Sequence, residues 1–594
     1  MRTSIATVCL SGTLADKLHA IADAGFDAVE IFEPDLIAAP QSPEEVRALC
    51  DRLGLEIALY QPFRDAEGVT EPEFEQVLRR AEAKFALMDR LGVETVLVCS
   101  NVATATIDDD AVSAAQLARL ADRAQSFGKR LAFEALAWGR YVDDYRRAWR
   151  IVERADHPAL GVCLDSFHIL SRGHDPADIE RIPGDRIFFV QLADAPLLSM
   201  DVLSWSRHHR LFPGEGGFDL PAFVGHTMRA GYTGPLSLEV FNDVFRQTDP
   251  ARTARHARRS LTVLADALAT GPVPPVVEPR ELDQVEVKAQ DIDLVAAVLE
   301  RIGFAARGRH ATKPAWLYAA GEARIVLNEH NAAGLNPHVA GFGIRSDRPD
   351  AAAARAERLG AQRAHRRVLA GEADLPALLA PDGTEILISG PQSGRTWPDE
   401  FSGGRGAADP AILGLDHVNL TEPAADIEEA VLFYGTALGL TRESSAELAG
   451  PAGLVRSQVL RSGDGAVRLA LNVVPPLAER ATKAAQPHAQ HVAIACDDLH
   501  ALIGRARARG LRTVPVSANY YDDLAARFDL PPGELERLRH SGLLYDRDAT
   551  GEYLHCYTET VGAVFFELVE RRGRYDGYGA ANTPVRLTAQ HSAA

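Results

Sequence analysis

Four oxygen-bearing side chains stand at the ends of four predicted strands in the first half of the chain. They are Glu134 at the end of LAFE, Asp165 at the end of GVCLD, Gln191 at the end of FFVQ and Glu239 at the end of LSLE. Three carboxylates that meet in one place repel one another unless a cation lies between them. Oxygen ligands suit hard divalent ions such as Mg2+ or Mn2+, with Co2+ as a further option. The four positions therefore predict a divalent-metal site, although each acid alone is more typical of a capped loop or a surface ion pair.

The segments that would position these residues alternate between short apolar runs and helical patterns. Glycines end several of the helical segments, as is typical of helix C-termini. Eight strand–helix repeats within residues 1–270 predict an α/β fold, a (β/α)8 TIM barrel. Because the chemistry of such barrels lies at the C-terminal ends of the strands, the four side chains should converge there. The predicted strands are residues 5–10, 28–32, 56–60, 95–100, 130–135, 160–165, 187–192 and 236–241.

The four predicted ligands occur together with two short motifs, LDSFH at 164–168 and FPGEGGFD at 212–219. This combination resembles the xylose-isomerase-like family of sugar isomerases, epimerases and dehydratases. The motif YQPFRD at 60–65 narrows the resemblance, as does the fusion of the barrel to a second half after residue 282. Together they resemble bacterial 3-dehydroshikimate dehydratases that carry a C-terminal domain similar to 4-hydroxyphenylpyruvate dioxygenase. The resemblance implies dehydration of 3-dehydroshikimate to protocatechuate in quinate and shikimate catabolism. The alternative is a sugar or inosose isomerase, epimerase or dehydratase of the same barrel family.

Dehydration of this substrate needs a base and an anchor for the substrate carboxylate. The metal would chelate an adjacent carbonyl and hydroxyl and stabilise the charge left when the α-proton is removed. His168 lies three residues beyond Asp165 and is predicted to be the base, with the orientation of a ligand as its alternative role. Arg64, and Ser206 together with Arg210 four residues later, are predicted to hold the carboxylate, against the alternative of solvated surface arginines. A neutral sugar would not need these arginines.

A proline-rich segment at residues 271–282 separates the barrel from the rest of the chain, which repeats itself. Residues 282–304 resemble residues 415–440, and residues 338–361 resemble residues 491–511. Each repeat reads as a strand, a helix and further strands. This pattern is similar to the vicinal oxygen chelate fold, an α+β arrangement of repeated βαβββ modules. It predicts two halves, at residues 283–395 and 410–580.

The last half carries three residues that suit a metal ion. His417, His491 and Glu567 fall at matching places on predicted strands, and two histidines with one carboxylate leave coordination positions open for other ligands. Fe2+ or Mg2+ is the expected ion. The preceding half is predicted to be metal-free and structural, because a glutamine replaces the first histidine; its residues at the corresponding places are predicted to be Gln284, His338 and Glu385.

Three motifs of the last half resemble 4-hydroxyphenylpyruvate dioxygenase: YYDDLAARF at 520–528, LLYDRDATGEYLHCYT at 543–558 and VFFELVERR at 564–572. Two features depart from that family. His555 stands where a glutamine is usual, and the tail after Arg572 reads GRYDGYGAANTP. Those regions shape the family's aromatic pocket. The resemblance therefore implies a metal site and leaves three roles open for this half: a dioxygenase, a support or oligomerisation domain, and a module that binds an aromatic product.

Composition excludes several partners. The 594 residues carry a net charge of −19, which argues against nucleic acid or an anionic membrane, since both attract a basic surface. The charge and the few strand-end histidines also argue against a phosphodiesterase of the endonuclease IV type. The six cysteines form no CxxC pair, which favours a reduced, cytoplasmic location. No apolar run reaches transmembrane length, and a homo-oligomer is compatible with the sequence.

Overall fold

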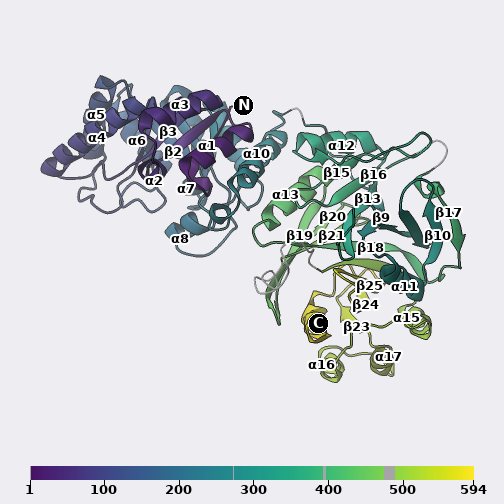
Figure 1. Ribbon diagram of the computed structural model, residues 1–594. Coiled ribbons are helices and arrows are strands. Elements are labelled where there is room, and N and C mark those ends of the chain that lie inside the picture. Colours follow the sequence, from purple (N-terminus) through teal and green to yellow (C-terminus); the bar gives the residue numbers. More distant parts are fainter. Residues whose placement is uncertain (1, 272, 392–395, 474–488, 594) are drawn as a thin grey trace. The chain divides into compact units, whose positions relative to one another are not determined.

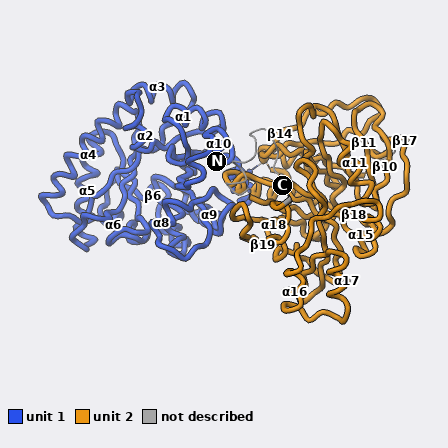
Figure 2. Tube along the Cα trace, turned by 60° about the horizontal axis from the view of Figure 1, so that its bottom comes forward, with its two compact units in different colours: residues 1–272 blue, residues 273–594 orange. Residues whose placement is uncertain are grey.

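The computed structural model describes residues 2–271, 273–391, 396–473 and 489–593. The chain divides into two compact units, Met1–Pro272 and Val273–Ala594 (Figure 2). Within the proline-rich segment, residues 273–280 contain no helix or strand, and β9 begins at Glu281. Proline fixes the backbone angle φ and lacks an N–H donor, so this composition supports neither element.

Unit 1 is a closed barrel of eight parallel strands, in which β1 also pairs with β8 (Figure 1). This confirms the predicted (β/α)8 fold. The strands are β1 Thr3–Ala6, β2 Ala28–Phe32, β3 Glu56–Phe63, β4 Thr95–Cys99, β5 Arg130–Glu134, β6 Leu160–Asp165, β7 Ile187–Leu192 and β8 Leu236–Leu238. The helices are α1 Leu14–Asp23, α2 Glu33–Ala38, α3 Pro43–Leu53, α4 Glu71–Leu91, α5 Asp110–Ser126, α6 Tyr145–Ala155, α7 Ser166–Leu170, α8 Val202–His208, α9 Leu220–Arg229 and α10 Pro250–Ala267.

The first and last barrel strands end earlier than the sequence predicts. β1 stops at Ala6, because the chain continues as a short 3-10 helix, Thr7–Cys9. β8 stops at Leu238, because the N–H of Val240 donates to Cys9 Sγ at 3.1 Å and not to a neighbouring strand. Glu239 therefore follows its strand directly, and its N–H still bonds the carbonyl of Leu192 on β7 at 3.1 Å.

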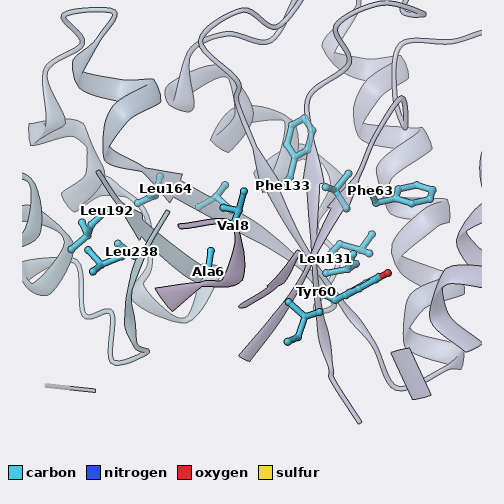
Figure 3. Close-up of a cluster of buried hydrophobic side chains, with 14 of the residues drawn as sticks. Ala6, Val8, Tyr60, Phe63, Leu131, Phe133, Leu164, Leu192 and Leu238 are labelled. Atoms are coloured by element: carbon cyan, nitrogen blue, oxygen red, sulfur yellow. The ribbon is translucent and has the colours of Figure 1, made fainter. Parts of the chain in front are cut away.

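Alternation along the barrel strands decides which side chains enter the interior. The larger apolar cluster joins helix residues such as Phe74 to Leu131 and Phe133 of β5, and is therefore the layer between strands and helices (Figure 3). A smaller cluster consists mainly of strand residues, including Ala132, and fills the barrel interior. Glu134 lies two residues beyond Ala132 and so shares its side of the strand. The same spacing relates Asp165 to Cys163, Gln191 to Phe189 and Glu239 to Ser237.

Unit 2 contains two sheets of mixed strands (Figure 1). The first has the order β14-β15-β16-β13-β9-β12-β11-β10-β17 and the second has the order β19-β20-β21-β18-β22-β25-β24-β23. The first comprises β9 Glu281–Lys288, β10 Ala305–His310, β11 Ala315–Ala320, β12 Ala323–Asn328, β13 His338–Arg345, β14 Gln362–Arg363, β15 Ala377–Leu379, β16 Glu385–Ser389 and β17 Phe401–Arg405. The second comprises β18 Ile412–Glu422, β19 Thr441–Gly450, β20 Gly453–Arg461, β21 Arg468–Val473, β22 Gln490–Cys496, β23 Leu544–Arg547, β24 Gly551–Tyr557 and β25 Val564–Gly573.

Each half of unit 2 is built from two modules that begin with a strand and a helix, as the sequence predicts. In the first half, α11 Asp293–Ile302 follows β9 and α12 Pro349–Arg358 follows β13. In the second half, α13 Ile427–Leu438 follows β18 and α15 Leu499–Ala508 follows β22. The described residues of the second half also form α16 Ala518–Arg527, α17 Glu534–Ser541 and α18 Thr583–Ala593. Among the helices of the described residues, none combines the length and apolar character needed to cross a bilayer.

Candidate metal centres

The C-terminal end of the barrel brings Glu134, Asp165 and His168 together. Asp165 ends β6 and caps α7, since its Oδ1 accepts the N–H of Phe167 at 2.6 Å and that of His168 at 3.3 Å. This cap fixes the turn that returns His168 to the carboxylates. His168 Nε2 lies 3.7 Å from Asp165 Oδ2 and 3.9 Å from Glu134 Oε1. One donor atom from each residue lies within 4.8 Å of the others, so the three could bind one ion.

Arg210 places a positive charge inside this carboxylate cluster. Its Nη1 donates to Asp165 Oδ2 at 2.8 Å and to Glu239 Oε2 at 3.0 Å. Its Nε and Nη2 donate to Ser206 Oγ at 3.1 and 2.8 Å, so the two residues share a face as their spacing predicts. The sequence prediction directs Arg210 to a substrate carboxylate, whereas in this structure the guanidinium is the cation that separates the acids.

Crowding of buried acids shifts their proton affinities. Burial, followed by the charges of Asp165 and Glu239, raises the pKa of Glu134. Burial likewise raises the pKa of Glu239 to about 7, against the opposing charge of Arg210. Burial would also raise the pKa of Asp165, but Arg210 and His168 together hold it below its ordinary value. The cluster thus holds more carboxyl groups than one guanidinium neutralises, which is the condition in which a divalent cation is favoured.

His168 is held as a neutral imidazole. Its Nδ1 accepts the N–H of Ala137 at 3.1 Å, and Nη2 of Arg210 lies 3.3 Å from its Nε2. Because Nδ1 accepts this hydrogen bond, the neutral ring carries its single proton on Nε2, and a second proton on Nδ1 would break the bond to Ala137. Burial, followed by the charges of Arg210 and Arg64, lowers the pKa of His168 to about 3, although Asp165 opposes this shift. The neutral ring is the form that a general base requires.

Gln191 and Glu239 complete the four predicted ligands, and Glu239 is not part of the tight group of three. Gln191 donates its amide Nε2 to Glu30 Oε2 at 2.7 Å, and within the described residues its carbonyl oxygen accepts only from the thiol of Cys163 at 3.5 Å. Glu30 therefore orients the amide so that the oxygen remains available. Glu134 Oε1 is buried and lacks a hydrogen-bond partner among the described residues. An all-oxygen donor set with such a free atom fits a hard divalent ion.

Glu30 is a buried acid that the sequence prediction missed. It accepts hydrogen bonds from Gln191, from Gln61 Nε2 at 2.9 Å and from the hydroxyl of Ser237. The sequence pattern AVEIF on β2 could have revealed Glu30, because an acid there occupies an inward position of an otherwise apolar strand, as Glu134 does on β5. Arg64, in contrast, lies on the surface after β3, and its guanidinium has no hydrogen-bond partner among the described residues.

The second centre is a convergent triad in the second sheet of unit 2. Glu567 Oε2 lies 3.3 Å from His417 Nε2 and 3.1 Å from His491 Nε2, and the two histidine nitrogens are 3.3 Å apart. These residues come from β18, β22 and β25, which are neighbours in the sheet. The three predicted residues therefore meet at one point, and their two nitrogens and one oxygen suit a divalent transition metal.

Surrounding residues fix the ligands of this triad. Asp416 Oδ1 lies 2.8 Å from His417 Nδ1, which directs Nε2 towards the other ligands, and Arg571 holds Asp416 with bonds of 2.7 and 2.8 Å. Burial would lower the pKa of His417, but Asp416 and Glu567 together raise it. His555, the departure noted in the sequence, lies with Nδ1 2.7 Å from Glu567 Oε1. It therefore contacts a predicted ligand directly.

The first half of unit 2 has lost all three ligand positions. Leu282 pairs with Ile344 and Gln284 with Gly343, as Leu415 pairs with Ile494 and His417 with Ala493. Gln284 therefore corresponds to His417, as the sequence predicts. Counted from the same pairs, the positions of His491 and Glu567 are occupied by Gly341 and Leu387.

The predicted equivalences of His338 and Glu385 are therefore wrong. Sequence similarity places His338 at the position of His491 and Glu385 at that of Glu567. The strand register moves the first of these positions by three residues, to Gly341, and the second by two residues, to Leu387. Glu385 instead pairs with Lys288 at 3.0 Å and with Arg366 at 3.0 Å. The expectation that this half carries no triad is thus supported, for a stronger reason than the loss of one histidine.

Comparisons with known proteins match both units. The family model of the xylose isomerase-like TIM barrel matches residues 18–265, and that of the Glyoxalase/Bleomycin resistance protein/Dioxygenase superfamily matches residues 414–535. A 3-dehydroshikimate dehydratase of Pseudomonas putida is 42% identical over 100% of this chain and 98% of its own length. One of Pseudomonas aeruginosa is 42% identical over 100% of this chain and 99% of its own length. A solved xylose isomerase-like TIM barrel/4-hydroxyphenylpyruvate dioxygenase fusion protein superposes with a TM-score of 0.90 at 40% identity, covering 100% of this chain and 99% of that one.

Proposed function

The chain belongs to the family of 3-dehydroshikimate dehydratases, and we propose that its barrel removes water from 3-dehydroshikimate to give protocatechuate. The observation that carries this proposal is the convergence of Glu134, Asp165 and His168 at the C-terminal end of the barrel. This is the end at which barrel enzymes hold their substrates. The reaction would serve the breakdown of quinate and shikimate.

The proposed barrel metal is Mg2+, Mn2+ or Co2+, held by Glu134, Asp165, Gln191 and Glu239. When bound, a divalent ion would polarise the substrate carbonyl and so acidify the neighbouring carbon. The free Oε1 of Glu134 and the oriented carbonyl oxygen of Gln191 support this assignment. Arg210 would give up at least one of its bonds to Asp165 and Glu239 as the ion takes over their charge.

His168 is proposed to remove the α-proton. The C–H bond next to the carbonyl breaks, the proton passes to the ring nitrogen of His168 that carries none, and the β-hydroxyl departs with a proton as water. The remaining dienone shifts a ring proton to its carbonyl oxygen and becomes aromatic. The position of the imidazole supports this role, because its Nε2 lies within 4 Å of Asp165 and Glu134, the proposed ligands of the ion that would hold the substrate.

Arg64 and Arg210, with Ser206, are proposed to hold the substrate carboxylate. The guanidinium of Arg64 has no hydrogen-bond partner in the described part of the chain, and its charge contributes to the lowered pKa of His168. Arg210 would turn towards the substrate once it is released from the acids, while Ser206 continues to fix one edge of its guanidinium. The two arginines would favour a carboxylate substrate over a neutral sugar of similar size.

Unit 2 is proposed to bind a second divalent ion, Fe2+ or Mg2+, at His417, His491 and Glu567. Because His555 departs from the dioxygenase family, a metal at the triad is compatible with two roles for this half: a dioxygenase, or a module that binds a ligand without reaction. Metal analysis combined with oxygen uptake in the presence of 2-oxo acids separates the two readings, because a binding module would consume no oxygen.

Incubation of metal-loaded protein with 3-dehydroshikimate tests the barrel activity directly. Appearance of aromatic ultraviolet absorbance, dependent on added divalent metal, is the expected result. Conversion of neutral inososes or sugars, with 3-dehydroshikimate left unchanged, would favour the isomerase alternative instead.

A further inference from the structure

The first half of unit 2 keeps an open cleft although it has lost the ligand triad. The cleft consists of a larger cavity of about 460 Å³ and a smaller one of about 80 Å³. Gln284 and Leu387, at the positions of His417 and Glu567, line the smaller cavity. Ligand cavities commonly have volumes of roughly 300–1,000 Å³, so the larger cavity is of ligand size. The two cavities adjoin, because they share four lining residues: Glu286, Lys313, Asn328 and Arg366.

The larger cavity is basic, although the chain as a whole carries a net charge of −19. Two carboxylates, those of Glu286 and Glu385, contribute to its wall. A concave wall in which positive charge predominates attracts small anions. Four cations outnumber the two acids: Lys288, Lys313, Arg366 and Arg367.

Both acids of this wall are already paired. Arg366 donates to Glu286 Oε2 at 3.1 Å and to Glu385 Oε2 at 3.0 Å, and Lys288 Nζ lies 3.0 Å from Glu385 Oε1. Burial would raise the pKa of Glu286, but the charges of Arg366 and Lys288 hold it below its ordinary value. Two cations thus balance two acids and leave the remaining cations of the wall for a ligand.

Arg367 is the cation of this wall without a counter-ion. Its guanidinium forms no ion pair or hydrogen bond within the described residues, whereas Lys313 is paired with Glu372 at 2.9 Å. The imidazoles of His330 and His365 line the same cavity, and neither ring has a hydrogen bond in the described part of the chain. Guanidinium and imidazole N–H groups donate to carboxylate and phosphate oxygens. This side of the cleft therefore matches an oxyanion.

Gln284 supplies a polar group at the other end of the cleft. Its side chain is buried, with 4% of the residue exposed, and its Oε1 has no hydrogen-bond partner among the described residues. The wall around it is largely apolar and includes Trp397 and Phe401. A buried acceptor without a donor is unfavourable, so the position suits a hydroxyl group of a ligand.

We propose that this cleft binds a small hydroxylated organic anion. Its phosphate or carboxylate group lies at Arg367 in the larger cavity, and a hydroxyl donates to Gln284 in the smaller one. The site uses no residue of either metal centre, so it is independent of the proposed dehydration. The half that lost its metal ligands would then keep a binding role.

Calorimetric titration of the full chain tests the anionic end with three probes: glycerol 3-phosphate, glycerate and uncharged glycerol. The natural chain should bind at least one of the two anions at millimolar concentration and should not bind glycerol. The tighter of the two anions identifies the charged group as phosphate or carboxylate. Arg367→Gln should weaken this binding by at least about fivefold, because it removes a charge-assisted hydrogen-bond donor. Arg307→Gln removes an exposed arginine of β10 that lines neither cavity, and as the matched control it should bind like the natural chain.

The hydroxyl end is tested with Gln284→Met, which keeps the length of the side chain and removes the amide. It should weaken binding of the hydroxylated anion by at least about threefold and leave binding of inorganic phosphate unchanged. If this variant does not fold, Gln284→Leu replaces it. Undiminished anion binding by Arg367→Gln would place the anion elsewhere, for example in the barrel, and would overturn the proposal. Absence of anion binding by the natural chain, or an unaltered affinity in the folded variant at residue 284, would overturn it as well.

Discussion

The two candidate centres compensate the charge of their buried ligands in different ways. In the barrel, the acids outnumber the cations, and Arg210 lies among them at hydrogen-bond distance from Asp165 and Glu239. In unit 2, one carboxylate meets two histidines, and Asp416 and Arg571 fix their orientation from outside. The barrel centre therefore needs a rearrangement to accept an ion, whereas the triad is already oriented for one. The comparison indicates that an ion in the barrel would change the position of Arg210, the arginine proposed to bind the substrate carboxylate.

Removal of Glu134 should have the largest effect. Glu134→Ala is expected to reduce dehydration by at least about 1,000-fold, because the ion loses a ligand and its Lewis-acid effect is worth several kcal/mol. The metal-free variant should melt at the same or a higher temperature, since one of the mutually repelling acids is gone. Absorbance assays and thermal unfolding measure the two effects, with Glu134→Gln as the isosteric control. Full activity of Glu134→Ala at ordinary metal concentration would contradict the ligand assignment.

Substitution of His168 should lower the rate of dehydration without removing the metal from the barrel. His168→Ala is expected to lower kcat by about 100- to 10,000-fold, as loss of a general base does, and to keep its bound metal. Metal analysis together with steady-state kinetics measures both quantities. His168 also lies within reach of Glu134 and Asp165, so the competing role is to orient these metal ligands. A variant that lost its metal and regained its rate with excess metal would establish that role instead.

The fold and most of the site were predictable because period-2 alternation and strand ends are local features. The inward positions of Glu134, Asp165 and Gln191 follow from the apolar residues around them on each strand. Glu30 could have been found by the same reasoning applied to β2. The position of Arg210 could not, because it depends on the loop after β7 folding back over the barrel, which is a tertiary property.

Strand register also lay outside what the sequence could decide. The repeats of unit 2 align by similarity at His338 and Glu385, but only the paired strands reveal that Gly341 and Leu387 occupy the ligand positions. A shift of a few residues within a short, apolar strand leaves little trace in sequence similarity. The strand register matters for the chemistry, because it decides which residues occupy the ligand positions of a metal site.

Glu67 offers a test of buried charge outside both centres. It lies in the loop after β3, and its Oε1 accepts the N–H of Asn101 at 2.8 Å while Oε2 lacks a partner among the described residues. Burial raises the pKa of Glu67 from 4.5 to about 7. Since the folded state then holds the proton more tightly than the unfolded chain, the stabilisation is present below pH 4.5 and is lost as the pH rises through about 7.

The free energy of unfolding should therefore fall by about 3 kcal/mol over this range on account of Glu67. Glu67→Gln does not titrate and should remove that part of the pH dependence. Urea unfolding of both proteins at pH 5 and pH 8 measures the difference, with metal chelated so that metal binding does not contribute; Glu134 and Glu239 titrate in both proteins and cancel in the comparison. Identical pH slopes in the two proteins would show that Glu67 ionises normally.

The smallest expected effect is that of the unit 2 triad on dehydration. His417→Ala should reduce the bound metal by one site, because His417, His491 and Glu567 converge on a single point. The dehydration rate should stay within about twofold of the natural chain, a change of less than 0.5 kcal/mol in the activation free energy. The physical reason is that the two centres share no ligand, and the barrel contains its own proposed base and acids.

Glu567→Gln provides a second variant with nearly unchanged volume, and circular dichroism checks that each protein is folded. A large loss of dehydration in both variants, with the fold intact and the barrel metal retained, would show that the second centre acts on the first and that the independence inferred from their separate ligand sets is wrong.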